Sequence, residues 1–136
     1  MDYKLLLEKA FLAKEMAYAP YSGFKVGAAI LSGGGEIYTG CNIENASYGL
    51  SICAERTALF NAVSKGHKDF TAIAIAASAG VSPCGACRQV LAEFSSEADI
   101  ITLNQEGGLD IIKVRELLPA AFSLKKDQLL SIPHLS

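Results

Sequence analysis

The sequence has little charge and lacks long runs of either basic or apolar residues. Charged side chains make up 19% of its 136 residues, whereas ordinary soluble domains carry about 25%. The formal net charge is −2, and Lys and Arg are scattered along the chain, so the basic footprint of a nucleic-acid-binding protein is missing. No apolar stretch approaches the roughly 18 residues that a membrane span needs. We therefore predict that neither a nucleic acid nor a membrane is a partner.

The shortage of charge also bears on assembly and location. Hydrophobic residues make up 51% of the chain, and this excess indicates either faces covered by other subunits or an apolar ligand pocket. The opening residues 1–4 lack the basic-then-apolar order of a signal peptide, which favours a cytoplasmic location. The length predicts a single domain, 1–136.

Histidine is scarce, and the capacity to bind a metal lies in cysteine. Neither of the two histidines has a second type of ligand near it at the spacing of a metal site, so a metal site would have to be built from sulfur. In a chain without an export signal, reduced thiols or metal ligands are favoured over disulfides. The four cysteines are Cys41, Cys53, Cys84 and Cys87.

The apolar patterning predicts a three-layer α/β/α domain with a mixed five-stranded sheet. The first hairpin is antiparallel, and helical crossovers make the middle strands parallel. The unbroken apolar run 72–77 suits a central strand buried on both faces, with helices above and below. We expect helices at 1–18, 52–65, 83–94 and 114–118, and strands at 24–31, 37–43, 72–77, 100–103 and 109–112.

The two middle helices are predicted to begin at cysteines. Residues 82–84, Ser-Pro-Cys, fit the N-cap, N1 and N2 positions, because serine caps free amides and proline is tolerated at N1. Residues 51–53, Ser-Ile-Cys, fit the same frame. Both cysteines would then lie where the positive end of the helix dipole stabilises a thiolate. Cys87 follows Cys84 by three residues, on the same helix face.

Helices that follow parallel strands start at one edge of the sheet, so Cys53, Cys84 and Cys87 are predicted to converge. Zinc is the metal that prefers soft ligands in a near-tetrahedral array. Three protein ligands leave the fourth position open to water, which is the catalytic arrangement. Glu55, two residues after Cys53, can take a proton from that water and deliver it elsewhere.

The negative charge of three thiolates around a zinc ion calls for a nearby cation. Three thiolates around Zn²⁺ leave a net charge of about −1, which makes the metal a weak Lewis acid. A cation beside the sulfur atoms would restore its acidity. Arg56, one turn after Cys53, and Arg88, next to Cys87, are the candidates.

Other sites also use a Cys-x-x-Cys pair. A redox dithiol needs only Cys84 and Cys87 and leaves Cys53 and Glu55 without a role. A structural zinc centre with Cys41 as the fourth ligand remains open, as does a non-enzymatic binding module stapled by zinc. The four-cysteine centre is disfavoured because the chain has a single Cys-x-x-Cys pair and lacks the spacing of twin zinc knuckles. Glu55 argues against the binding module, because a structural site has no use for a carboxylate beside an open position. Cys41 is otherwise interpreted as a small buried hydrophobic residue.

Two segments, 53–55 (Cys-Ala-Glu) and 83–87 (Pro-Cys-Gly-Ala-Cys), resemble the paired motifs of the zinc nucleoside deaminases. Over nearly its whole length the chain resembles the small homotetrameric cytidine deaminases of the cytidine and deoxycytidylate deaminase superfamily. Residues 42–44, Asn-Ile-Glu, narrow the resemblance to the branch that acts on free nucleosides. The matching segments are 19–22 with Phe24, 40–46, 53–58, 82–90 and 116–119 with Phe122; the departures are Gly23, the short loop 78–81 and the tail 123–136.

For the centre, the resemblance implies one Zn²⁺ per chain, bound by Cys53, Cys84 and Cys87. It implies that Glu55 moves protons from water to ring nitrogen N3 and then to the departing ammonia. Arg56 would offset the thiolate charge. The reaction would be hydrolytic deamination of cytidine and 2′-deoxycytidine to uridine and 2′-deoxyuridine, a step of pyrimidine salvage.

For the substrate, the resemblance implies that Asn42 and Glu44 hydrogen-bond the ribose and that Phe24 stacks on the base. Tyr48 and Phe122 are expected to complete a neighbouring subunit's pocket in a homotetramer. An alternative is a deaminase of a cytosine-containing antibiotic such as blasticidin S, which shares the zinc motifs. The acidic charge disfavours a polynucleotide cytosine deaminase. The backbone groups implied to read the pyrimidine edge are those of Ala54, Ser82 and Cys84.

Overall fold

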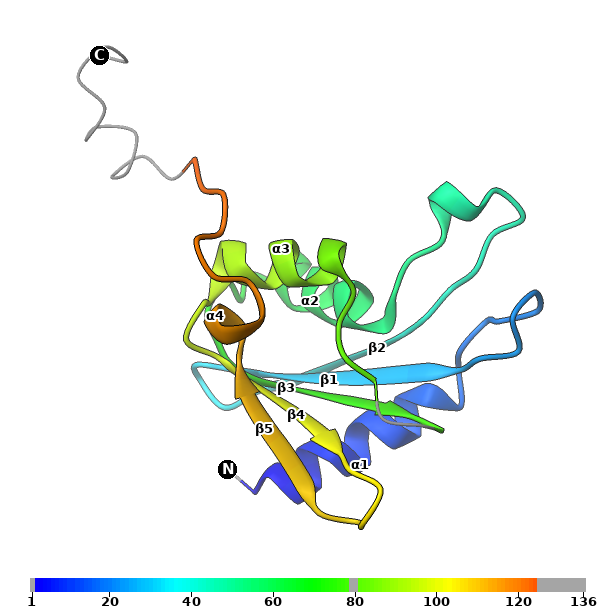
Figure 1. The fold of residues 1–136 in the computed structure, drawn as a ribbon, viewed down its shortest axis with the longest axis horizontal. Coiled ribbons are helices and arrows are strands. Elements are labelled where there is room, and N and C mark those ends of the chain that lie inside the picture. The colour runs from blue at the N-terminus through cyan, green and yellow to red at the C-terminus, as the bar shows by residue number, and fades with distance from the viewer. Residues whose placement is uncertain (1, 79–80, 125–136) are drawn as a thin grey trace.

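The computed structural model describes residues 2–78 and 81–124, and it contains a five-stranded mixed sheet with helices on both faces (Figure 1). The strand order is β2-β1-β3-β4-β5; β3 and β4 are parallel, and the other neighbouring pairs are antiparallel. The predicted three-layer α/β/α fold is thereby confirmed. None of the helices in these ranges is long and apolar enough to cross a membrane. The elements are α1 (Tyr3–Lys14), β1 (Val26–Ser32), β2 (Ile37–Cys41), η1 (Tyr48–Leu50), α2 (Ala54–Ser64), β3 (Phe70–Ala77), α3 (Gly85–Phe94), β4 (Asp99–Leu103), β5 (Leu109–Lys113) and α4 (Val114–Leu117).

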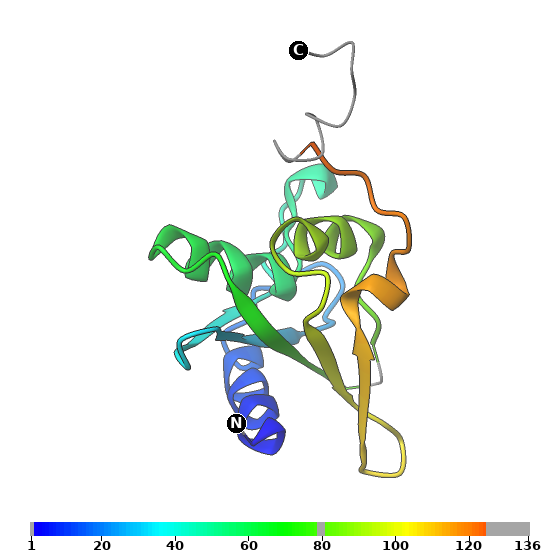
Figure 2. The same cartoon turned by 90° about the vertical axis from the view of Figure 1, so that its left-hand side faces the viewer.

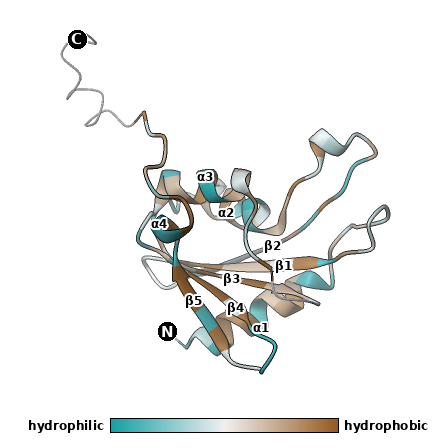
Figure 3. Ribbon diagram, in the orientation of Figure 1, coloured by the Kyte–Doolittle hydropathy of each residue, from teal (hydrophilic) through white to brown (hydrophobic). Residues whose placement is uncertain are grey.

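The sheet separates two hydrophobic cores, one under α1 and one under α2 and α3 (Figure 2). Along β3, Ile73 and Ile75 belong to the core on the α2 and α3 side. Ala72, Ala74 and Ala76 belong to the core on the α1 side. The strand is therefore buried on both faces, as its unbroken apolar run predicted. Figure 3 shows hydrophobic residues along β3 and β4.

The topology brings two helix N-termini to one edge of the sheet. Strands β2 and β3 both run antiparallel to β1, which lies between them, so they point in the same direction. The chain leaves β2 toward α2 and leaves β3 toward α3. Both helices consequently start near the carboxyl ends of these strands, which is the usual place for a site in an α/β fold.

Helix α1 ends at Lys14, earlier than the 18 residues that its apolar repeat predicted. The amide of Ala17 donates to the carbonyl oxygen of Lys14 in a turn. Tyr18 then forms an isolated parallel bridge with Ile43, and its amide donates to the carbonyl oxygen of Asn42 at 3.0 Å. Pairing with a distant segment thus replaces the last helical turn, and the prediction for residues 15–18 was wrong for this reason.

Candidate metal centre and active site

The starts of α2 and α3 carry the three predicted zinc ligands. Cys53 is the N-cap of α2, Cys84 is the N-cap of α3, and Cys87 lies in the first turn of α3. The predicted frame with Ser51 and Ser82 as N-caps is wrong, because both helices begin two residues later. At α3 the Sγ atom of Cys84 accepts a hydrogen bond from the amide of Cys87 at 3.4 Å. Sulfur therefore caps the helix in place of a serine hydroxyl.

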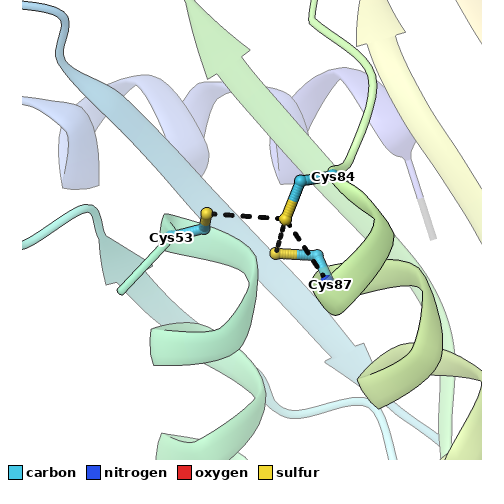
Figure 4. Close-up of side chains that lie close together, drawn as sticks. All are labelled: Cys53, Cys84 and Cys87. Atoms are coloured by element: carbon cyan, nitrogen blue, oxygen red, sulfur yellow. Dashed lines mark hydrogen bonds between the residues drawn. The ribbon is translucent and has the colours of Figure 1, made fainter. Parts of the chain in front are cut away.

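The three sulfur atoms face one another between the two helices (Figure 4). Sγ of Cys84 lies 3.8 Å from Sγ of Cys53 and 3.4 Å from Sγ of Cys87, and all three lie within 4.8 Å of one another. Zn–S bonds of about 2.3 Å in a tetrahedral array place sulfur atoms about 3.8 Å apart. The donor set and its spacing therefore fit a zinc ion. Among the residues described, no fourth protein ligand joins the group, which leaves one coordination position for water or substrate.

The pKa of Cys53 is lowered, whereas the pKa of Cys41, the cysteine outside the sulfur group, is raised. The pKa of Cys53 is lowered to about 5, because it accepts hydrogen bonds from the thiol of Cys87 and from Nη2 of Arg56, which lies 3.6 Å away. The same bond to Cys53, together with burial, raises the pKa of Cys87. Cys41, half-buried in β2, has its pKa raised by burial and stands outside the sulfur group. It is not a fourth ligand.

The two candidate arginines have different surroundings. Arg56 contacts the sulfur of Cys53, and its Nε atom is buried without a hydrogen-bond partner in the described chain. Arg88 instead donates to the carbonyl oxygen of Pro83 and to the hydroxyl of Ser82. Arg56 is thus the arginine with the geometry to offset thiolate charge.

Glu55 lies in the first turn of α2 and is only 5% exposed. Burial, and after it the negative charge of Cys53, raises the pKa of its carboxyl group. Glu55 also lines the same cavity as Cys53 and Cys84. A carboxyl group with a raised pKa exchanges protons closer to neutral pH than an exposed glutamate does.

A cavity of about 490 Å³ gathers most of the residues expected at the site. It lies over the starts of α2 and α3 and is bounded by the segments after α1 and β2. Its lining also includes positions to which sequence reasoning assigned no role at the site, although Ser22 fell inside a motif that carried the resemblance. The expected residues in the lining are Phe24, Asn42, Glu44, Tyr48, Cys53, Ala54, Glu55, Arg56, Ser82 and Cys84; the unassigned ones are Ser22, Val26, Ser51, Ile52 and Val81.

Asn42 connects two walls of this cavity. Its side-chain amide donates to the carbonyl oxygen of Phe24 at 2.8 Å and accepts from the amide of Val26 at 2.8 Å. These bonds continue the pairing of β1 and β2 beyond Cys41, where the regular strand ends. Asn42 therefore holds the segment that presents the ring of Phe24, a contact that its position in the sequence did not reveal.

Glu44 is held by the loop that follows α1. Its carboxylate accepts hydrogen bonds from the amides of Tyr21 and Ser22, at 3.0 and 3.1 Å, and from the hydroxyl of Ser22. The bonds from Ser22 keep the pKa of Glu44 below its usual value. Gly23 ends this turn with φ of +71°, a conformation that glycine adopts without strain. An ionised carboxylate therefore stands in the lining of the cavity.

The two residues expected to reach a neighbouring subunit are both exposed. Tyr48 is 78% exposed in η1 and lines the cavity of its own chain. Phe122 is 67% exposed and lies outside the lining of that cavity, with its carbonyl oxygen bound by Gln89. The expectations for the loop 78–81 and the tail 123–136 fall largely on residues 79–80 and 125–136, outside the described residues.

Comparison with known proteins identifies the family. Residues 1–103 match the cytidine and deoxycytidylate deaminase zinc-binding region, a segment that contains Glu55 and all three clustered cysteines. The chain therefore belongs to the zinc-binding cytidine and deoxycytidylate deaminase family.

Individual relatives cover nearly the whole chain. It is 52% identical over 126 residues to a cytidine deaminase of Halalkalibacterium halodurans, with 90% of this chain and 96% of the relative covered. It is 50% identical to a cytidine deaminase of Sporosarcina psychrophila, with 90% and 93% covered. The crystal structure of cytidine deaminase from Burkholderia pseudomallei superposes with a TM-score of 0.85 and 46% identity, over 90% of this chain and 100% of that one.

Proposed function

We propose that the protein hydrolyses free cytidine and 2′-deoxycytidine to uridine and 2′-deoxyuridine with release of ammonia. One observation carries the proposal: Cys53 and Cys84, two of the three cysteines spaced for zinc, border the same cavity as the buried carboxyl group of Glu55. A structural zinc centre has no use for that carboxyl group. The cytidine deaminases that resemble this chain over 90% of its length support the same reaction.

Cys53, Cys84 and Cys87 would hold the zinc ion through their sulfur atoms. When bound, zinc lowers the pKa of a water in its open position and so supplies a nucleophile for C4 of cytosine at neutral pH. Arg56 lies beside the sulfur of Cys53 and offsets the negative charge that three thiolates bring.

Glu55 is assigned the proton transfers. One proton of the attacking water passes through its carboxyl group to N3 of the ring. The second passes from the new hydroxyl on C4 to the amino group, which leaves as ammonia when the C4–N4 bond breaks. The raised pKa of Glu55, caused first by burial, suits a group that both accepts and releases protons near neutral pH.

The walls of the cavity position the nucleoside. Phe24, Ala54, Ser82 and Cys84 line the cavity. Phe24 would stack on the base, and the backbone groups of the other three would read the pyrimidine edge. Asn42 uses one of its two side-chain N–H groups on Phe24, so the second is free for a ribose hydroxyl. Glu44 accepts from the loop before β1 and keeps acceptor capacity for a second hydroxyl.

Charge in the cavity favours a nucleoside over its 5′-phosphate. Glu44 is held in its ionised form, because hydrogen bonds from Ser22 lower its pKa. Arg56 is the only Lys or Arg among the described lining residues, and it already contacts Cys53. A phosphate at this site would meet a carboxylate and no free cation, which is unfavourable.

We also propose a homotetramer in which Tyr48 and Phe122 reach a neighbouring subunit's pocket. Both are large, exposed aromatic side chains, and covering such surfaces would explain a chain with 51% hydrophobic and 19% charged residues. Sedimentation velocity tests the assembly. A fully active monomer at assay concentration would contradict it.

The decisive experiment is an activity assay on purified protein whose zinc content has been measured. We expect about one zinc per chain and loss of cytidine absorbance with equimolar ammonia for cytidine and 2′-deoxycytidine. Deoxycytidylate and blasticidin S, assayed beside them, should react far more slowly. Zinc-loaded protein that is inert on both nucleosides would overturn the proposal, and turnover of blasticidin S alone would redirect it to the antibiotic.

A further inference from the structure

Arg88, on α3 next to the sulfur centre, binds two other segments of the chain, residues 82–83 and the end of α4. From α3, its Nε atom donates to the carbonyl oxygen of Pro83 at 2.8 Å, and its Nη2 atom donates to the hydroxyl of Ser82 at 2.9 Å. Its Nη1 atom donates to the carbonyl oxygen of Leu117 at 3.0 Å. A planar guanidinium group can serve three acceptors in fixed directions, which a lysine ammonium on a flexible stem cannot reproduce.

The bond to Pro83 sets the direction of the next amide group. The peptide between Pro83 and Cys84 is trans, as are the other peptide bonds of the described residues, so its N–H points opposite to its C=O. Arg88 holds that carbonyl oxygen on one side. The amide of Cys84 is therefore aimed to the other side, away from Arg88, and it donates to no group in the described part of the chain. Cys84 itself borders the substrate cavity.

The same turn of α3 also holds the C-terminal segment. Arg88 binds the carbonyl oxygen at the last residue of α4, Leu117, an end where helical carbonyls lack partners of their own. The adjacent Gln89 donates through Nε2 to the carbonyl oxygen of Phe122 at 3.1 Å. Two neighbouring side chains on one helix thus join residues 82–83 to residues 117–122.

We propose that Arg88 is a positioning residue for the deamination reaction. It acts through residues 82–84: by fixing Ser82 and the Pro83 carbonyl oxygen, it aims the backbone groups of this turn at the pyrimidine edge of the substrate. Its bond to Leu117 keeps α4 against the same turn. The inference rests on the proposed function, because it assigns residues 82–84 to the recognition of cytosine.

The test compares Arg88→Gln and Arg88→Lys with wild-type protein in zinc content, KM and kcat for cytidine. A misdirected backbone hydrogen bond weakens binding, so the KM of zinc-loaded Arg88→Gln should rise about tenfold. Arg88→Lys should recover only part of this loss, because it keeps the charge without the planar fork. Simple loss of folded protein would lower the apparent kcat and leave KM unchanged.

Arg115→Gln is the matched control. Arg115 lies on α4 and pairs with Glu97 at the surface, so its loss removes one positive charge nearby without touching residues 82–84. Its KM should equal that of the wild type. If Arg88→Gln does not fold, Ser82→Ala replaces it, because this change removes one acceptor of Arg88; its KM should rise about threefold.

The outcomes separate this inference from the proposed function. Zinc-loaded wild-type protein without activity on cytidine overturns the function. Wild-type activity with an unchanged KM in folded Arg88→Gln, or in Ser82→Ala where the former does not fold, overturns only the role of Arg88. An equal rise of KM in Arg115→Gln also overturns it, because the effect would then be one of charge.

Discussion

Replacing Gly40 with alanine should lower kcat strongly while it reduces the free energy of unfolding only modestly. Gly40 lies in β2 under α2, where an added Cβ would overlap the backbone N of Ala58 and lie 2.8 Å from both the carbonyl carbon and Cβ of Thr57. Ordinary contact begins at 3.4 Å. Relieving the Thr57 contacts alone requires α2 and β2 to move apart by 0.6 Å, the difference between 3.4 and 2.8 Å, and the overlap with Ala58 requires more.

The displacement reaches the site because Glu55 lies one helical turn before Ala58 on α2. Overpacking of this kind costs about 1–3 kcal/mol of the free energy of unfolding. A catalytic group displaced by about 1 Å loses up to about a hundredfold in rate. For Gly40→Ala we expect a modest loss of stability. We also expect a kcat roughly 10- to 100-fold lower, because a displacement of this size misplaces Glu55.

The assay combines urea unfolding, zinc content and steady-state kinetics on cytidine. Gly33→Ala is the control, since a Cβ at Gly33 would meet its nearest neighbour, Cβ of Asp69, at an ordinary 3.6 Å. Gly33 lies in the β1–β2 turn, and its variant should match the wild type in kcat. Wild-type kcat in folded, zinc-loaded Gly40→Ala would refute the reasoning that close packing of α2 on β2 sets the position of Glu55.

Three further changes probe the proton carrier, an acid-sensitive contact and the metal. Glu55→Gln should keep its zinc and lose kcat by about 100-fold or more, because the general acid–base group is gone; normal turnover with full zinc occupancy would remove Glu55 from its role. Asp99 accepts hydrogen bonds from the Tyr3 hydroxyl and the Lys113 ammonium group, and these lower its pKa from the ordinary 3.8. That stabilisation is present above the ordinary value and is lost as pH falls through the lower folded-state pKa, so the gap between wild type and Asp99→Asn in urea unfolding should shrink from pH 7 toward strong acid; a gap that widens would contradict this sign. Chelation of zinc should lower the melting temperature and abolish activity, and added zinc should restore both; activity that survives complete removal of zinc would contradict a catalytic role for the metal.

The parts of the structure that depend on local patterns agree with the sequence. The hairpin at the start of the sheet, the doubly buried β3 and the convergence of three cysteines all follow from periodicity and spacing. The resemblance to nucleoside deaminases also predicted that Phe24 and Glu44 line the same cavity. These features can be predicted from residues that are close in the sequence, or from the order of helices and strands along the chain.

Features that depend on distant partners could not be predicted. Capping rules favour serine and proline, so they placed both helix starts two residues early, whereas the sulfur of Cys84 performs the capping at α3. The pairing of Tyr18 with Ile43 ends α1 early. The partner of Arg88 at Leu117 lies 29 residues away in the sequence, and nothing in the local composition marks it as an acceptor.

The β1–β2 turn offers a place to attach a reporter. Because β1 runs against both of its neighbours, residues 33–35 lie at the opposite edge of the sheet from the starts of α2 and α3 (Figure 1). Strand β2, with five residues, separates this turn from Asn42 by about 17 Å. A short peptide tag inserted after Gly34 can therefore immobilise or label the protein while its substrate cavity remains accessible.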